Sequence, residues 1–196
     1  MKIVVATHNE HKLGELKEII KHQDIELVSL KNYDIDMSVV EENGDTFIDN
    51  AIIKAKYVAS IIDEFVLADD SGLCLDAYPE LLGVHTARFR QDLDYPGRQK
   101  VVYEMIKDKT NKAAFKCALC LITPTKEVIT VEAITEGEIH EPKGLKGFGY
   151  DPVFYSYDLN IRFSEVDENV KNSVSHRGRA GRMIIDELKK RGLINE

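Results

Sequence analysis

The sequence predicts a mixed α/β protein, and three observations lead to this prediction. Short apolar runs rich in β-branched residues alternate with segments whose apolar residues recur every three or four positions. Two long strand-like runs, 113–123 and 128–135, are separated by a few residues around Pro124, as in a hairpin. No fixed-period repeat, low-complexity stretch or Pro/Gly/Ser-rich linker divides the 196 residues, so we expect residues 1–196 to form a single domain.

The expected elements follow one another along the whole chain. Runs of apolar and β-branched residues predict strands at Ile3–Ala6, Ile25–Leu30, Phe65–Ala68, Ala113–Thr123, Val128–Thr135 and Val153–Tyr155. Apolar residues at helical spacing predict helices at Lys12–Lys21, Thr46–Ile62, Gly97–Lys107 and Ser175–Arg191. We expect Asp45 to cap the second helix and Gly192 to end the last one. A glycine-rich loop, Gly144–Tyr150, precedes the last strand.

Composition and charge exclude several classes of protein. The content of 43% hydrophobic and 31% charged residues is typical of a globular domain that can bury its own core. The longest apolar run, Cys117–Ile122, is far shorter than the roughly 20 residues of a membrane helix. A net charge of −8 argues against general binding to nucleic acid. The N-terminus lacks the features of a signal peptide, and three cysteines do not form a disulfide framework, so we expect a cytoplasmic protein.

Residues 7–12, Thr-His-Asn-Glu-His-Lys, lie at the turn from the first strand into the first helix. A helix N-terminus has unpaired N–H groups and a partial positive charge, so it attracts phosphate. The threonine, asparagine and lysine side chains add donors and a full charge. The Walker pattern is absent, and the alternative interpretation is an ordinary capped turn.

Two acidic motifs offer oxygen ligands. Asp69-Asp70-Ser71-Gly72 directly follows an apolar strand, where the ligand sites of α/β folds gather. Neighbouring carboxylates there point to opposite sides, so one can enter a site while the other braces the loop. Such ligands suit Mg²⁺, which binds one or two carboxylates together with substrate phosphates. Glu41-Glu42 offers a further carboxylate, and the alternatives for the two motifs are a hydrogen-bonded turn and a solvated charge pair.

Two further motifs are suited to a flat ligand such as a base. Glycines flank Phe148, which lets the backbone approach a flat ligand while the ring stacks on it. His176 and Arg177, at the start of the last helix, can donate hydrogen bonds to carbonyl oxygens of a base, and Lys171 upstream can meet a phosphate or a carbonyl oxygen. The alternatives are a loop with a packed aromatic ring and a solvated basic turn.

Taken in order, these motifs match one known pattern. The matching segments are Thr7-x-Asn9-x-x-Lys12, Glu41-Glu42 with Thr46-Phe47 and Asn50-Ala51, Ala68–Leu73, Gly83-Val84 through Ala87–Phe89, Gly147–Pro152 and Ser175–Gly178. The chain closely resembles the inosine/xanthosine triphosphate pyrophosphatase family from about Lys2 to Leu188.

The resemblance implies an elongated α/β fold with a central mixed sheet flanked by helices, two lobes with an active-site cleft between them, and a homodimer. It also implies Mg²⁺-dependent hydrolysis of ITP, dITP and XTP to the nucleoside monophosphate and pyrophosphate, which cleanses the nucleotide pool. Two alternatives are a noncatalytic nucleotide-binding regulatory module and a related pyrophosphatase for modified pyrimidine nucleotides. The acidic pair Asp69-Asp70 argues against a pure binding module, because negative charge beside a triphosphate weakens binding.

The resemblance further assigns roles to individual residues. Asp70 is expected to be the catalytic base and, with Glu41, the metal ligand, and the adjacent Glu42 is the alternative to Glu41. The residues expected to bind substrate are Thr7, His8, Asn9, Glu10, His11, Lys12, Lys54, Ser71, Phe148, Gly149, Tyr150, Asp151, Lys171, His176 and Arg177. Hypoxanthine and xanthine carry a 6-oxo group where adenine carries an amine, so donors from His176 and Arg177 would favour the deaminated bases.

Overall fold

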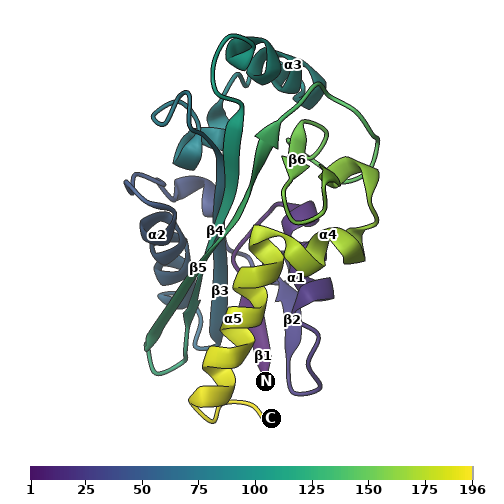
Figure 1. Ribbon diagram of the computed structural model, residues 1–196. Coiled ribbons are helices and arrows are strands. Elements are labelled where there is room, and N and C mark those ends of the chain that lie inside the picture. The colour runs from purple at the N-terminus through teal and green to yellow at the C-terminus, as the bar shows by residue number, and fades with distance from the viewer. Residues whose placement is uncertain (196) are drawn as a thin grey trace. The chain divides into compact units, whose positions relative to one another are not determined.

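The computed structural model describes residues 1–195 and contains one mixed sheet with helices packed against it (Figure 1). The helices are α1 (Glu10–Ile19), α2 (Phe47–Ala59), α3 (Tyr95–Ile106), α4 (Glu168–Val174) and α5 (His176–Lys190). The strands are β1 (Lys2–Val5), β2 (Glu26–Ser29), β3 (Phe65–Leu75), β4 (Lys112–Ile122), β5 (Val128–Ile139), β6 (Phe154–Ser156) and β7 (Ile161–Arg162). The predicted α/β class is therefore confirmed.

The strands follow the order β2-β1-β3-β4-β5-β6-β7 in the sheet. β1 pairs in parallel with both β2 and β3, whereas β6 pairs antiparallel with β5 and β7, so the sheet is mixed as predicted. The neighbours β4 and β5 are joined by a short turn in which the Thr123 N–H donates to the Glu127 carbonyl at 3.0 Å. This pairing of the two long strands is the one that the sequence predicts.

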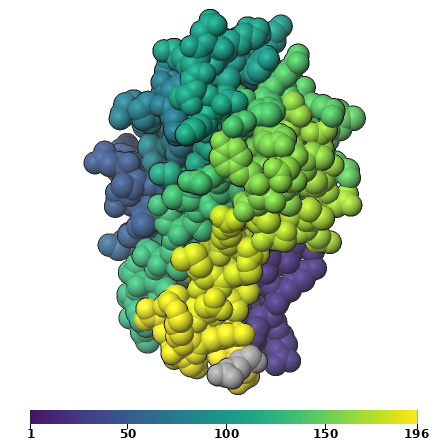
Figure 2. Space-filling view, viewed as in Figure 1, coloured from purple at the N-terminus to yellow at the C-terminus, as the bar shows by residue number. Residues whose placement is uncertain are grey.

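The chain divides into two compact units, and the first contains Met1–Asp70, Cys117–Ala133 and the segment from Arg177 onward. Its core lies between the strands and the apolar stripes of α1 and α5, where Leu16 and Ile184 are fully buried. Figure 1 shows α5 running in front of these strands and α2 on their other side. In Figure 2 the last helix (yellow) borders the N-terminal segment (purple), and Asn195 hydrogen-bonds Asp24.

The second unit contains Ser71–Lys116 and Ile134–His176. Its core is aromatic: Phe115, Phe154 and Phe163 pack with ring centroids 4.6–6.2 Å apart. Position 72 requires a glycine, because a Cβ on Gly72 would lie only 2.4 Å from the Gly83 carbonyl oxygen. This close approach joins the acidic motif to the 3₁₀ helix Gly83–Arg88.

β3 differs from the prediction in a way that matters for the site. The sequence predicts a strand that ends at Ala68, but β3 continues through Asp69 and Asp70 to Leu75, so this prediction is wrong. The loss of the apolar pattern at the two aspartates does not end the strand, because basic side chains from other segments pair with both carboxylates. The acidic motif is therefore held in extended backbone rather than in a loop.

Other boundaries differ by smaller amounts. The N-cap of α2 is Thr46 and not Asp45, because the Thr46 hydroxyl accepts from the Asp49 N–H at 3.1 Å. α3 begins two residues earlier than predicted, capped by Asp94, and β5 extends beyond Thr135 to Ile139. The short elements α4 and β7 are not predicted, since their sequences carry no clear periodicity. No helix in residues 1–195 combines the length and apolar character needed to cross a membrane.

Candidate active site

Asp69 and Asp70 lie side by side in β3 and serve different partners. Successive side chains of a strand point to opposite faces. The Asp69 carboxylate therefore faces α1 and α5, and the Asp70 carboxylate faces α2. This alternation is the arrangement that the sequence predicts. Each aspartate is nearly buried, and each is the centre of a polar cluster within the first unit.

The cluster around Asp69 is a chain of alternating charges, which we call the Asp69 network. One Asp69 carboxylate oxygen accepts from the ammonium of Lys12, and the other accepts from Nε of Arg177 at 2.9 Å. The Arg177 Nη1 donates in turn to Glu15 at 2.5 Å. The thiol of Cys117 donates to Asp69 at 3.2 Å. The network thus ties the predicted phosphate loop to the start of α5.

The charges of the Asp69 network stabilise one another in a place that excludes water. Burial alone would raise the pKa of Asp69, but the Arg177 guanidinium and the Lys12 ammonium hold it well below its usual range. The pKa of Arg177 is raised in spite of burial, because Asp69 and Glu15 lie against it. Burial raises the pKa of the Cys117 thiol well above its ordinary value, so that thiol stays protonated and acts as a donor.

The cluster around Asp70 contains residues of α2 and of the loop before it. The ammonium of Lys54 donates to Asp70 at 2.9 Å and to Glu42 at 2.8 Å. The amide of Asn50 contacts the other Asp70 oxygen at 3.4 Å, and its own carbonyl oxygen accepts from the Gly44 N–H at 2.8 Å. A helix thus presents one cation and one amide to a carboxylate at the end of the first unit's part of β3.

Glu42 and Glu41 occupy different environments. Glu42 is half-buried and accepts from the Lys54 ammonium, which also donates to Asp70, whereas Glu41 is exposed. Burial favours a higher pKa for Glu42, but the Lys54 charge lowers it below the usual value, so Glu42 is ionised at neutral pH. Burial raises the pKa of Asp70, and Lys54 opposes this effect. Two carboxylates close together beside one cation are a donor set that fits Mg²⁺.

The residues of the predicted phosphate loop surround the N-terminus of α1. Asn9 is the N-cap, and its side chain accepts from the Lys12 N–H at 3.1 Å. The Thr7 hydroxyl accepts from the Asn9 N–H at 3.1 Å. His8, Glu10 and His11 are exposed. From this loop, the Lys12 ammonium reaches Asp69 of β3.

In the second unit, Phe148 is held by Asp151 and Lys171. The Phe148 N–H donates to the Asp151 carboxylate at 2.8 Å, and the Lys171 ammonium donates to the same oxygen at 2.6 Å. The ammonium also lies 4.8 Å from the centroid of the Phe148 ring. Gly147, with φ of +74°, is required here because a Cβ would lie 2.2 Å from Asp151. Four predicted base-site positions, 148–151, therefore form one braced loop with Lys171.

His176 and Tyr150 are buried in the same unit. The His176 ring stacks on Phe115, with centroids 4.7 Å apart and planes at 10°. The Tyr150 ring meets Tyr95 edge-on at 5.8 Å. Burial raises the pKa of Tyr150 to about 12, and its hydroxyl has no hydrogen-bond partner among residues 1–195. Ser71 is half-buried in β3, at the start of this unit.

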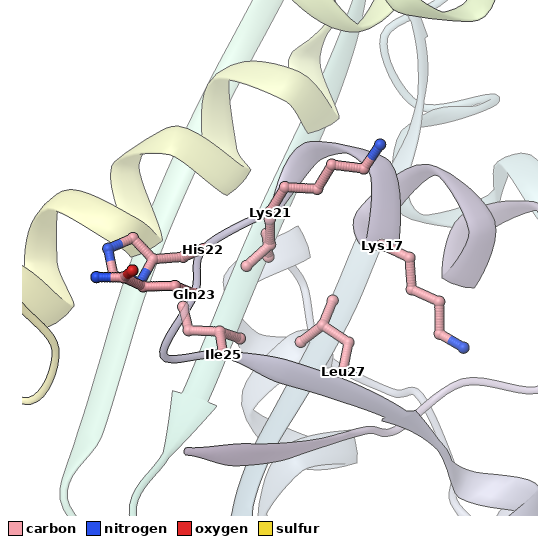
Figure 3. A pocket seen from close by; sticks show the side chains of 7 residues that line it. Lys17, Lys21, His22, Gln23, Ile25 and Leu27 are labelled. Atoms are coloured by element: carbon pink, nitrogen blue, oxygen red, sulfur yellow. The ribbon is translucent and has the colours of Figure 1, made fainter.

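Two surface hollows lie apart from these residues. One, of about 440 Å³, is lined by α1 and the segment leading into β2, including Lys17, His22 and Leu27 (Figure 3). The other, of about 450 Å³, is lined by residues of the second unit that include Lys107, His140 and Arg162. Neither of these two hollows is lined by a predicted site residue.

Comparison with known proteins decides the family. The model of the Ham1 family matches residues 3–187. The chain belongs to the Ham1 family. Among its relatives, the dITP/XTP pyrophosphatase of Dictyoglomus thermophilum is 42% identical over 180 residues, covering 89% of this chain and 88% of that protein. The dITP/XTP pyrophosphatase of Bacillus subtilis is 40% identical over 182 residues, covering 90% and 91%.

Solved structures show the same fold. A HAM1 protein from Coxiella burnetii superposes with a TM-score of 0.86 at 33% identity, covering 97% of this chain and 99% of that one. A nucleoside-triphosphatase / dITP/XTP pyrophosphatase from Mycobacterium abscessus gives a TM-score of 0.72 at 36% identity, covering 94% and 98%. The predicted family resemblance is thus confirmed over nearly the whole Ham1 chain.

Four residues of the two clusters in the first unit are not among the site residues predicted from the sequence, although Glu42 is named as the alternative to Glu41. They are Glu15, Glu42, Asn50 and Cys117. A signal for Glu15 was available, because this carboxylate lies three residues after Lys12, next to Leu16 on the apolar face of the predicted helix. Cys117 offers no such signal, since a cysteine in an apolar strand is typical of a core.

Proposed function

We propose that this Ham1 protein hydrolyses the deaminated purine nucleoside triphosphates ITP, dITP and XTP to the monophosphate and pyrophosphate. The observation that carries the proposal is the cluster of Asp70, Glu42 and Lys54, which joins two carboxylates and a cation next to the Asp69 network. The relatives named dITP/XTP pyrophosphatase support the substrate class.

Asp70 is proposed as the base that accepts a proton from the attacking water. Its pKa is raised by burial, and a carboxylate of higher pKa accepts a proton more readily. Lys54 holds Asp70 in place, and the raised pKa of Lys54 keeps it charged beside the phosphates. Lys12 and the N-terminus of α1 would bind the rest of the triphosphate, with Thr7 and Asn9 shaping the loop.

The braced loop of the second unit is proposed to bind the base. Lys171 lies against the Phe148 ring, which leaves the purine to stack on the opposite face of that ring. His176, fixed by its stacking on Phe115, is proposed to donate to the 6-oxo group that distinguishes hypoxanthine and xanthine from adenine. The Arg177 guanidinium donates to Asp69 and Glu15. Its role in reading the base stays a prediction.

A divalent cation, Mg²⁺, would be held by Asp70 and Glu42 together with phosphate oxygens. When bound, it would offset the repulsion between these carboxylates and the triphosphate. It would also polarise a P–O bond of the phosphate under attack, which makes the phosphorus more electrophilic. Within residues 1–195, no group of three or more His, Cys, Asp or Glu side chains is placed to hold a metal ion. Mg²⁺ bound by these two carboxylates would take its further ligands from substrate phosphates and water. We assign the second ligand to Glu42, because Glu42 shares the Lys54 ammonium with Asp70, whereas Glu41 is exposed.

Glu42→Gln and Glu41→Gln form a matched pair that tests the metal assignment. We expect Glu42→Gln to raise the Mg²⁺ concentration for half-maximal ITP hydrolysis at least about tenfold, since a neutral amide is a weaker ligand. Glu41→Gln should leave it unchanged. The measurement is the rate of pyrophosphate release during a Mg²⁺ titration. A shift for Glu41→Gln alone would assign the ligand to Glu41 and contradict our assignment.

The homodimer is a proposal that follows from the resemblance, and the cytoplasmic location and the single domain 1–196 are proposals that follow from the sequence. A protein that removes abnormal triphosphates before polymerases use them would act where the nucleotide pool lies. Gel filtration with light scattering of the purified Ham1 protein measures the oligomeric state directly.

A further inference from the structure

Gln99 of α3, which has no role in the proposed catalysis, hydrogen-bonds the loop that carries Phe148. Its side-chain amide donates to the backbone carbonyl of Gly149 at 2.6 Å, across 50 residues of sequence and within the second unit. Gln99 is 6% exposed although it lies in a helix whose neighbouring residue, Lys100, is exposed. The side-chain amide of a buried glutamine usually has a hydrogen-bond partner that replaces the water it has lost.

The acceptor of this bond lies in the braced loop itself. Gly149 stands between Phe148 and Tyr150, so the bond fixes the peptide that directly follows the stacking ring. Tyr95, one helical turn before Gln99, meets Tyr150 edge-on and lies 3.7 Å from the Cβ position of Gly149. Residues four apart lie on one face of a helix, so α3 presents an amide to Gly149 and a ring to Gly149 and Tyr150.

The helix that presents them is itself well anchored. Asp94 caps α3 by accepting from the Gly97 N–H at 2.9 Å, and the Arg98 guanidinium lies 5.0 Å from the Tyr95 ring centroid. Arg98 also donates to the carbonyl of Leu93 at 3.0 Å. Asp151 and Lys171 brace the loop on the Phe148 side, whereas the Gln99 amide braces the peptide at Gly149.

We propose that Gln99 is a positioning residue for recognition of the purine base, acting through the Gly149 carbonyl to hold the Phe148 ring in its stacking position. The inference rests on the proposed base site at Phe148. Gln99 touches neither the phosphates nor the attacking water in this role, so its contribution is to binding of the base and not to the chemical step. Loss of the amide donor therefore raises KM and leaves kcat in place.

The test compares Gln99→Met, which keeps the length and packing of the side chain but removes the donor, with Lys100→Met on the exposed face of α3. We expect Gln99→Met to raise KM for ITP roughly tenfold, with kcat changed by less than about twofold and no change for Lys100→Met. Inorganic tripolyphosphate, a competitor without a base, should inhibit wild type and Gln99→Met with the same Ki. The melting temperature of each variant is recorded alongside.

A Phe148→Leu variant separates failure of this inference from failure of the proposed site. If Phe148→Leu raises KM for ITP while Gln99→Met does not, Gln99 has no positioning role. If Phe148→Leu leaves KM unchanged, the base does not stack there and both proposals fail. If Gln99→Met lowers kcat and weakens tripolyphosphate to the same extent as it raises KM, its role is general structural support and the inference is overturned.

Discussion

Asp70→Asn is expected to lower kcat for ITP hydrolysis by about a thousandfold while ITP still binds. Asparagine has nearly the shape of aspartate, and its carbonyl oxygen can still accept from Lys54, but the amide cannot accept a proton from water. The change also removes one of the two carboxylates proposed to hold Mg²⁺. The measurement is single-turnover hydrolysis of ITP at saturating Mg²⁺, with ITP binding followed by calorimetry.

The matched control is Asp63→Asn, because the Asp63 side chain is 92% exposed and pairs only with Lys126 among the ion pairs of residues 1–195. This variant should hydrolyse ITP at the wild-type rate. If Asp70→Asn retained full hydrolysis with unchanged binding, Asp70 would not be the base and the proposed chemistry would be wrong.

Asp69→Asn is expected to have its main effect on stability. Asp69 pairs with both Lys12 and Arg177, and a neutral amide would remove the negative charge that these two cations share in a buried place. Removing one member of a buried ion network costs about 3–5 kcal/mol. For a chain of this length we expect the melting temperature to fall by roughly 10 °C.

A second consequence of Asp69→Asn concerns the phosphate loop. Lys12 loses its acceptor on β3, so KM for ITP should rise as well. Thermal unfolding followed by circular dichroism gives the first effect, and steady-state kinetics at a temperature where the variant is folded give the second. A melting temperature within about 2 °C of wild type would show that the Asp69 network does not contribute as described.

Much of the fold could be predicted because most elements carry their own periodicity. The apolar stripe of α5 and the alternating pattern of β5 need no knowledge of their neighbours. The continuation of β3 beyond Ala68 could not be predicted in this way. Asp69 and Asp70 remain in the strand because Lys12, Lys54 and Arg177, which lie 16 to 108 residues away, pair with them in space.

The residue types of the candidate site could be predicted from ordered motifs, but their pairings could not. Glu41 and Glu42 are neighbours in sequence, and only the fold of the loop before α2 determines that Glu42 meets Lys54. Arg177 is predicted to read the base, and the sequence does not reveal that its guanidinium also pairs with Asp69 and with Glu15, the latter across 162 residues. One sequence gives no signal for an ion pair of such separation.

The most direct test of the account is product analysis with a panel of triphosphates. Pyrophosphate and orthophosphate released from ITP, dITP, XTP, GTP, ATP and dUTP would be measured separately, with Mg²⁺ and with chelator. We predict pyrophosphate release from ITP, dITP and XTP far in excess of that from the other three, and none with chelator. Turnover of dUTP alone, orthophosphate as the product, or tight binding of ITP without hydrolysis would each contradict it.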